Sequence, residues 1–342
     1  MKKYFFNNEE VNIIEYDSIR NKKIILNNIK NNKFNINNFI LKPKEIAVSD
    51  FTSNPNIVKL TPDFLFNELD DRIEILEMIN ENTVNKDSND LVLNKFGSPL
   101  YTMHFTSMTS EDSYNREVID YIVDNAKIEI DSDISVISEM NKRCLDYSIV
   151  ERQFKKNNLA YINSALDEDI WCNTNKIRYI LDSLKQVKTK YTLIIDGRDV
   201  LLTKSFDKEF INKFKSYNKP IVYNATLWRY PSIEEVGEIK GEDEITNEKY
   251  SSNNLNAGVC FGETETLIKF YEYAEEINKR IKNNHSEQFI IRHTRVAHPE
   301  LVEIDYKCIL FYSNNPVQQI KTCNFKDKKI FIVKNTENNK LL

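Results

Sequence analysis

The sequence predicts an α/β protein whose mixed, Rossmann-like sheet is flanked by helices. From about residue 131 the chain alternates short apolar strands with amphipathic helices, an order typical of sheets that are at least partly parallel. The segment 191–197 (YTLIIDG) carries a continuous apolar run, which is expected of a strand with both faces covered. With 342 residues, 41% of them hydrophobic, the chain is long enough for roughly two domains.

The second half of the chain follows a strand-helix-strand-helix-strand order. We expect strands at 133–139, 159–166, 191–197 and 219–225, and helices at 146–157 and 173–187. The helix at 173–187 has one apolar face, formed by Ile177, Ile180, Leu181, Leu184 and Val187. In sheets of this kind ligands bind beyond the carboxyl ends of the strands, so polar side chains at those ends are candidates for a site.

Residues 1–130 are rich in Asn and in charged side chains, and we expect them to form an α+β accessory region of unknown role. Apolar runs predict strands at 22–29, 38–43, 56–60 and 100–108, and helical spacing predicts helices at 63–81 and 116–126. This region contains no motif that indicates chemistry. The chemistry is therefore expected in a second domain, residues 131–342.

The composition argues against several classes of protein. A net charge of −5 does not favour nucleic-acid binding, which normally needs a basic face. The sequence has no apolar stretch of about 18 residues that would predict a membrane span, and its first residues lack the apolar core of a secretory signal. The five cysteines are scattered without a CxxC pair, so neither a zinc ribbon nor a disulfide framework is indicated. These features predict a cytoplasmic protein with reduced cysteines.

The segment 196–199 (DGRD) places two carboxylates directly after the apolar run. Hard divalent cations such as Mg²⁺ and Mn²⁺ prefer oxygen ligands, so Asp196 and Asp199 can hold such an ion together with diphosphate oxygens. The alternative is a turn in which an Asp caps a helix and pairs with Arg198. Only 6 glycines occur in the chain, and half of them fall in DGRD and NAGVCFG, which indicates that the backbone turns sharply or approaches something closely there.

Seven stretches between about residues 131 and 320 resemble motifs of one protein family and follow one another in the same order as in that family. They are ISVISE, EDIWCNTNKIRYIL, LIIDGRDVLL, KPIVYNATLWRYPS, NLNAGVCFG, HSEQFIIRHT and VEIDYKCILFYSNN. Together they resemble the GT-A glycosyltransferases, specifically the glycosyltransferase domain of procollagen lysyl hydroxylases and the related collagen galactosyl- and glucosyltransferases. The resemblance implies a GT-A fold for residues 131–342. It also implies metal-dependent transfer of a hexose from a UDP-sugar to a protein or glycan acceptor, with retention of anomeric configuration.

The resemblance assigns several residues to the nucleotide and its ion. Asp196 and Asp199 would hold Mn²⁺, or Mg²⁺, and the diphosphate of the UDP-sugar. Ser138, just after the first strand, and Trp171 would lie near the nucleotide, where an indole face can stack on uracil or ribose. Lys176 would reach a phosphate from the start of a helix. The alternatives are a packing role for the tryptophan and a solvated position for the lysine.

Other residues would contact the donor sugar. Asn256 and Gly258 would shape the floor beneath it, the amide of Asn256 bonding to hydroxyl groups. Glu287 and Gln288 would be catalytic, with Glu287 bonding to the sugar or stabilising positive charge at the anomeric carbon. The alternative for Glu287 is an exposed helix carboxylate. Arg198 stands where the family often has an aromatic residue, a change that would alter base contacts or donor preference.

Two departures from the family keep a second interpretation open. The stretch HSEQFIIRHT resembles the helix that carries the family's D-D-Q trio, but Ser286 replaces the first Asp of that trio. No histidine lies in the late H-G-N-G-like motif that supplies the family's third metal ligand; the histidines are His104, His285, His293 and His298. Either the domain is truncated at its C-terminus or it lacks that ligand. The alternative function is a catalytically inactive GT-A-like domain that binds a nucleotide or a glycan. An aspartyl phosphatase is disfavoured, because its two Asp residues usually stand two apart and are followed by Thr or Val.

Overall fold

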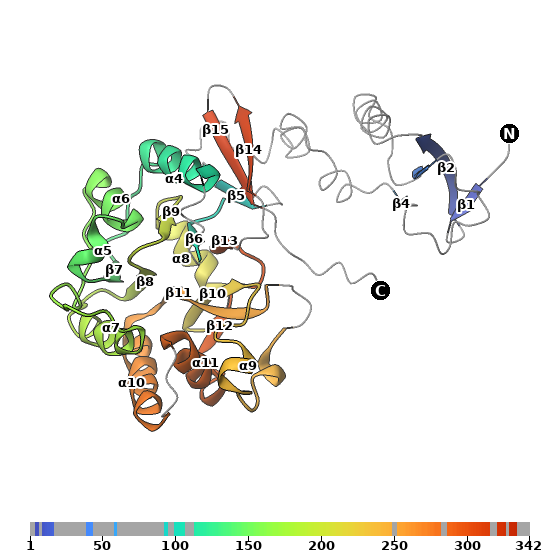
Figure 1. Ribbon diagram of the computed structural model, residues 1–342. Helices are drawn as coiled ribbons and strands as arrows, with labels where there is room; N and C mark the ends of the chain where they lie inside the picture. Colours follow the sequence, from blue (N-terminus) through green and yellow to red (C-terminus); the bar gives the residue numbers. More distant parts are fainter. Residues whose placement is uncertain are drawn as a thin grey trace. The chain divides into compact units, whose positions relative to one another are not determined.

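A computed structural model of the chain describes residues 4–6, 9–16, 39–43, 58–59, 92–94, 99–106, 113–247, 252–281, 286–314, 320–325 and 328–333 (Figure 1). The chain divides into two compact units, Met1–Asn80 and Glu81–Leu342. This division differs from the boundary expected near residue 130. The reason is that strand β6 (Thr102–Phe105) pairs with two strands that lie beyond residue 199.

The first unit contains a sheet with the strand order β1-β2-β3-β4. β2 is antiparallel to β1 and parallel to β3, which is antiparallel to β4. The strands expected at 38–43 and 56–60 are confirmed by β3 and β4, whereas the strand expected at 22–29 and the helix expected at 63–81 lie outside the described residues. The bounds are β1 (Tyr4–Phe6), β2 (Glu9–Tyr16), β3 (Phe39–Pro43) and β4 (Val58–Lys59).

A mixed sheet with the strand order β12-β10-β11-β8-β7 forms the centre of the second unit. β7 runs parallel to β8 and β10 runs parallel to β12, while β11 is antiparallel to both of its neighbours. The predicted α/β class, with a mixed sheet flanked by helices, is thereby confirmed. The strands are β7 (Ile134–Glu139), β8 (Tyr191–Asp196), β10 (Ile221–Thr226), β11 (Asn254–Glu263) and β12 (Val302–Ile304).

Helices cover both faces of this sheet (Figure 1). Leu193 and Ile195 of β8 pack in one hydrophobic cluster with α4, α6 and α8, whereas Ile194 packs in the other with α7, α10 and α11. This arrangement explains the continuous apolar run of β8, because successive side chains of a strand point to opposite faces. The helices are α4 (Ser113–Asn125), α6 (Ile149–Asn157), α7 (Lys176–Leu184), α8 (Lys208–Lys215), α10 (Thr264–Arg280) and α11 (Glu287–Ala297).

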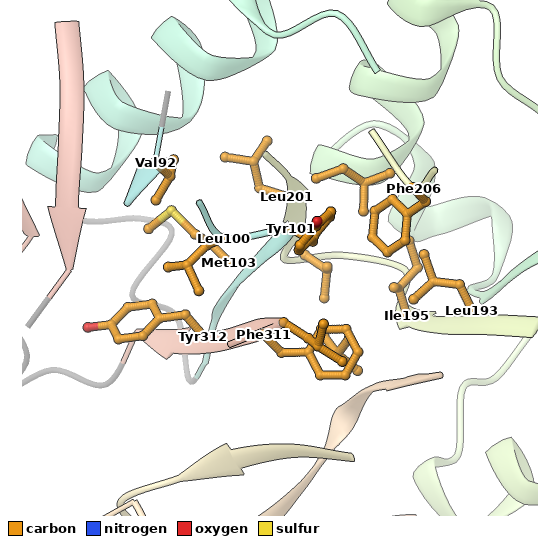
Figure 2. Close-up of a cluster of buried hydrophobic side chains, with 14 of the residues drawn as sticks. Val92, Leu100, Tyr101, Met103, Leu193, Ile195, Leu201, Phe206, Phe311 and Tyr312 are labelled. Carbon is orange, nitrogen blue, oxygen red and sulfur yellow. The ribbon is translucent and has the colours of Figure 1, made fainter. Parts of the chain in front are cut away.

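Two smaller sheets join segments that are distant in the sequence. β6 lies between β13 (Phe311–Asn314) and β9 (Val200–Leu202), parallel to the first and antiparallel to the second. Figure 2 shows side chains of β5, β6, β8, β9 and β13 in one hydrophobic cluster, so residues before and after 130 share a core. The other small sheet is formed by β14 (Ile320–Phe325), β15 (Lys328–Val333) and β5 (Val92–Asn94).

The strand expected at 159–166 is wrong. This segment makes a single bridge to the sheet, between Ile137 and Ile162. After Ile162 the backbone hydrogen-bonds to a side chain rather than to a neighbouring strand. The carboxylate of Glu139 accepts a hydrogen bond from the Ser164 N–H at 2.9 Å. A local side-chain acceptor of this kind competes with strand pairing.

The helices expected at 146–157 and 173–187 are present but shorter. α6 begins at Ile149, because the Ser148 hydroxyl caps it by accepting the Glu151 N–H at 2.9 Å. The second is divided into a 3₁₀ turn, η4 (Asn173–Asn175), and α7. No helix among the described residues is long and apolar enough to span a bilayer. The remaining short elements are α5 (Lys142–Leu145), α9 (Ile233–Val236) and η5 (Asp243–Ile245).

Candidate functional site

The candidate site lies at the carboxyl ends of β7 and β8, where Glu139 and Asp196 are paired in register. The turn that follows β8 is tied to the cap of α6, because the Ser148 hydroxyl donates a hydrogen bond to the Gly197 carbonyl. A side chain at Gly197 is excluded, since its Cβ would lie 2.8 Å from the Cβ of Met140. The turn therefore has a fixed backbone from which its carboxylates project.

His104 reaches this turn from β6. The Phe105 N–H donates to the Asp199 carbonyl at 2.9 Å, which brings β6 beside the turn. The Nε2 atom of His104 lies 3.4 Å from Asp196 Oδ2 and 3.3 Å from Asp199 Oδ1. One ligand atom from each of the three residues lies within 4.8 Å of the others, so a single metal ion can contact all three. Imidazole and carboxylate donors together suit first-row divalent metals.

Two buried cations, His104 and Lys176, lie beside the carboxylates of the site. Burial by itself lowers the pKa of His104, but the charges of Asp199 and Asp196 and their hydrogen bonds outweigh it and raise this pKa to about 10. Burial alone would raise the pKa of Asp196, but the nearby Lys176 and His104 hold it well below its usual range. Against the effect of burial, Asp196 and Glu287 raise the pKa of Lys176 above its ordinary value. The negative oxygens of the site are thus stabilised by the positive charges of His104 and Lys176.

Lys176, the first residue of α7, bridges two carboxylates. Its Nζ donates to Asp196 Oδ1 and, at 3.0 Å, to Glu287 Oε1. The side chain of Lys176 is 6% exposed and that of Glu287 is 15% exposed. Neither is therefore the solvated helix residue that the sequence left open as an alternative.

Residues of strand β11 and of the first turn of α11 also belong to the site. The Asn256 Oδ1 accepts the Gly258 N–H at 3.0 Å and lies 2.8 Å from His104 Nδ1. The Gln288 Oε1 accepts the Ala257 N–H at 3.1 Å. Asn256 thus contacts both the imidazole of His104 and the backbone of β11, and Gln288 holds the backbone of β11. Both residues also line a cavity.

A cavity of about 700 Å³ opens among these groups, a size typical of a site for a small molecule or cofactor. All the residues predicted for the site except Ser138 line it: Trp171, Lys176, Asp196, Arg198, Asp199, Asn256, Gly258, Glu287 and Gln288. These residues come from four segments that are distant in the sequence. The described structure therefore gathers them at one place.

Ser138 is the exception and corrects one prediction. It lies inside β7, opposite Ile195, rather than after the strand, and its side chain is fully buried. The next residue, Glu139, ends β7 and lines the cavity instead. The difference follows from the one-residue alternation of a strand, which turns neighbouring side chains to opposite faces.

Sequence reasoning missed several cavity residues. His104 lies in an apolar strand segment and Glu139 closes another, so neither stands in a polar motif. Trp228 and Tyr230 also line the cavity, and they are 56% and 52% exposed. A usable signal was the segment LWRYP, where two large aromatic residues flank an arginine directly after a strand.

A buried ion pair holds this aromatic segment. Arg292 of α11 donates to both carboxylate oxygens of Glu242, each at 2.6 Å. The same guanidinium donates to the carbonyls of Tyr230, at 3.1 Å, and Pro231, at 2.9 Å. The rim of the cavity near Trp228 is therefore anchored to the helix that carries Glu287 and Gln288.

Comparison with models of known protein families gives no match, and neither does a search of curated proteins. The chemistry of the site must therefore be inferred from its own side chains. These offer oxygen and nitrogen ligands for a divalent cation, a buried lysine for an anion, and exposed aromatic faces at the rim.

Proposed function

We propose that this protein is a metal-dependent glycosyltransferase of the GT-A type that transfers a hexose from a UDP-sugar to a protein or glycan acceptor. One observation carries the proposal: the Asp196–Asp199 turn, Lys176 and the first turn of α11 line the same cavity at the carboxyl ends of the parallel pair β7 and β8. Ligands bind at this edge of open α/β sheets.

The carboxylates of Asp196 and Asp199 would hold Mn²⁺ or Mg²⁺. When bound, the ion would neutralise charge on the diphosphate as it leaves the sugar. Lys176 would supply a second positive charge to the phosphates, since its Nζ lies beside Asp196. Trp171, which precedes η4 in the chain, would offer a face for uracil or ribose.

Glu287 and Gln288 would act on the donor sugar. The Glu287 carboxylate is held by Lys176 at 3.0 Å and lines the cavity, so it is available to bond to the sugar or to stabilise positive charge at the anomeric carbon. Gln288 fixes the backbone of β11, on which the sugar would lie. By resemblance to the family, transfer would retain the anomeric configuration.

Trp228 and Tyr230 would meet the acceptor. Both side chains border the cavity, and more than half of each remains exposed. Their flat apolar faces suit a sugar ring of a glycan acceptor.

The alternative is a domain that binds nucleotide without turnover, and one observation favours it. Ser286, which replaces a carboxylate of the family trio, caps α11 by accepting the Phe289 N–H at 3.3 Å and is 1% exposed. That position therefore serves the helix and does not reach the cavity.

Calorimetric titration of UDP, with and without Mn²⁺, tests the proposal. We expect binding that requires Mn²⁺ and is lost in Asp199→Ala, followed by hydrolysis of at least one UDP-hexose. UDP binding without hydrolysis or transfer for any UDP-sugar would favour the alternative. Absence of UDP binding in both conditions would refute the UDP-sugar transferase and the nucleotide-binding form of the alternative, and would leave its glycan-binding form.

A further inference from the structure

We propose that His104 supplies, through Nε2, the third protein ligand of the divalent cation held by Asp196 and Asp199, and that Asn256 is the residue that positions it. The proposal rests on the proposed function and names the ligand set of its metal site. The histidine comes from β6, ahead of the carboxylates in the sequence, whereas the family that the sequence resembles places its histidine near the end of the domain.

The first argument is the placement of the ring. His104 is paired with Val200, the first residue of β9, and β9 follows Asp199 directly. Strand pairing therefore fixes the distance between β6 and the turn. The side chain of His104 is 5% exposed, and its Nε2 faces the carboxylates of Asp199 and Asp196 at 3.3 and 3.4 Å. A histidine buried against two carboxylates, with a solvent-connected cavity beside it, has the surroundings of a ligand rather than of a packing residue.

The second argument fixes the tautomer. A backbone N–H can only donate, so the Asn256 atom that receives the Gly258 N–H at 3.0 Å must be the amide oxygen. The same oxygen lies 2.8 Å from His104 Nδ1, which must therefore carry a hydrogen. With Nδ1 as the donor, Nε2 is the nitrogen left to meet a metal ion. Metal-binding histidines are typically oriented by such a bond from the second ring nitrogen.

The third argument is the space around the ring. A Cβ atom at Gly258 would lie 2.1 Å from His104 Cε1 and 2.8 Å from Asp196 Oδ2. Only glycine lets the imidazole and the carboxylate lie against β11 here. The pairing of β10 with β11 shifts register at this place, since consecutive residues of β10 are opposite Cys260 and Asn256. Bulges of this kind re-aim side chains at functional sites.

The test uses Mn²⁺ alone, without nucleotide, and the full chain. Pulsed EPR of the bound Mn²⁺ should show coupling to a ¹⁴N nucleus in the wild type and none in His104→Gln. His104→Gln should weaken Mn²⁺ binding about tenfold or more, and Asn256→Ala should weaken it about 10- to 100-fold, as is usual for partners that orient a ligand. Asn256→Asp keeps an oxygen that can accept both the Gly258 N–H and the His104 Nδ1–H. The ¹⁴N coupling should therefore be present in Asn256→Asp, as in the wild type.

His298→Ala is the matched control, because that histidine lies next to Glu300, outside the lining of the cavity, and its loss should leave both readouts unchanged. Circular dichroism checks the folding of each variant. Bound Mn²⁺ without ¹⁴N coupling in the wild type would overturn the proposal while leaving the proposed function intact, if Asp199→Ala still abolishes binding. If the wild type binds no Mn²⁺ even with saturating UDP, the metal-dependent function itself fails, and this inference fails with it.

Discussion

Replacing Arg292 should lower the free energy of unfolding of the second unit more than replacing a surface residue does, because Arg292 is buried and paired. Its guanidinium is 1% exposed, and the carboxylate of Glu242 that receives its two hydrogen bonds is 8% exposed. Breaking a buried pair by removing one partner costs about 3–5 kcal/mol, since the other charge stays buried. We expect Arg292→Met to lie near the lower end, about 3 kcal/mol, because Arg229 Nε remains 3.9 Å from Glu242 Oε2 and offsets part of the charge.

Urea denaturation followed by tryptophan fluorescence measures this loss, because both tryptophans, Trp171 and Trp228, lie in the second unit. The double variant Arg292→Met with Glu242→Leu removes both charges. Its free energy of unfolding should fall by only about 1–2 kcal/mol, because the carbonyls of Tyr230 and Pro231 lose their donor. A loss below about 1 kcal/mol for Arg292→Met, or a double variant as unstable as the sum of the two singles, would refute the reasoning.

Three further predictions concern the site itself. The pKa of His104 is raised from 6.5 to about 10, so its contribution to the stability of the ion-free protein is complete below pH 6.5 and is lost as the pH rises through about 10. The free energy of unfolding of the wild type, relative to His104→Gln, should therefore shrink over that range in urea titrations. Lys176→Met removes the cation that occupies Asp196 and should tighten binding of Mn²⁺ alone by about tenfold, since close charge pairs are worth ~1–4 kcal/mol, while calorimetry should show weaker UDP binding. Trp228→Ala should change the free energy of unfolding by less than about 0.5 kcal/mol, as its side chain is largely exposed. It should also lower transfer to a glycan acceptor about threefold to tenfold without changing hydrolysis of the UDP-sugar, and Tyr273→Ala, at another exposed aromatic residue, is its control.

The central sheet could be predicted because its signals are local. The apolar run of β8, the amphipathic face of α7 and the alternation of strands and helices each depend on neighbouring residues. The pairing of β6 with β9 and β13 joins segments about a hundred or more residues apart, and no periodicity in the sequence records such a pairing. This is why the domain boundary was expected near residue 130.

The same distinction applies to the site. Asp196, Asn256 and Glu287 stand in polar motifs next to strand and helix ends, where side chains face a cavity in α/β sheets. His104 could not be recognised, because it lies within an apolar strand and acquires its role only through pairing with β9. The strand expected at 159–166 failed for a related reason, since the acceptor that captures its backbone, Glu139, belongs to another segment.

The two carboxylates after an apolar strand are explained by the path of the chain. β8 ends at Asp196 in the central sheet, and β9 begins directly after Asp199 in the neighbouring sheet, so the turn passes from one sheet to the other. Side chains on such a turn are covered by neither sheet alone, and their charges are met by His104 from one side and Lys176 from the other. A cation bound there would join the two sheets and stabilise the native state by about 2.7 kcal/mol at a hundred times its Kd. The turn that connects the two sheets is thus also the place where negative and positive side chains lie close enough to contact one ligand.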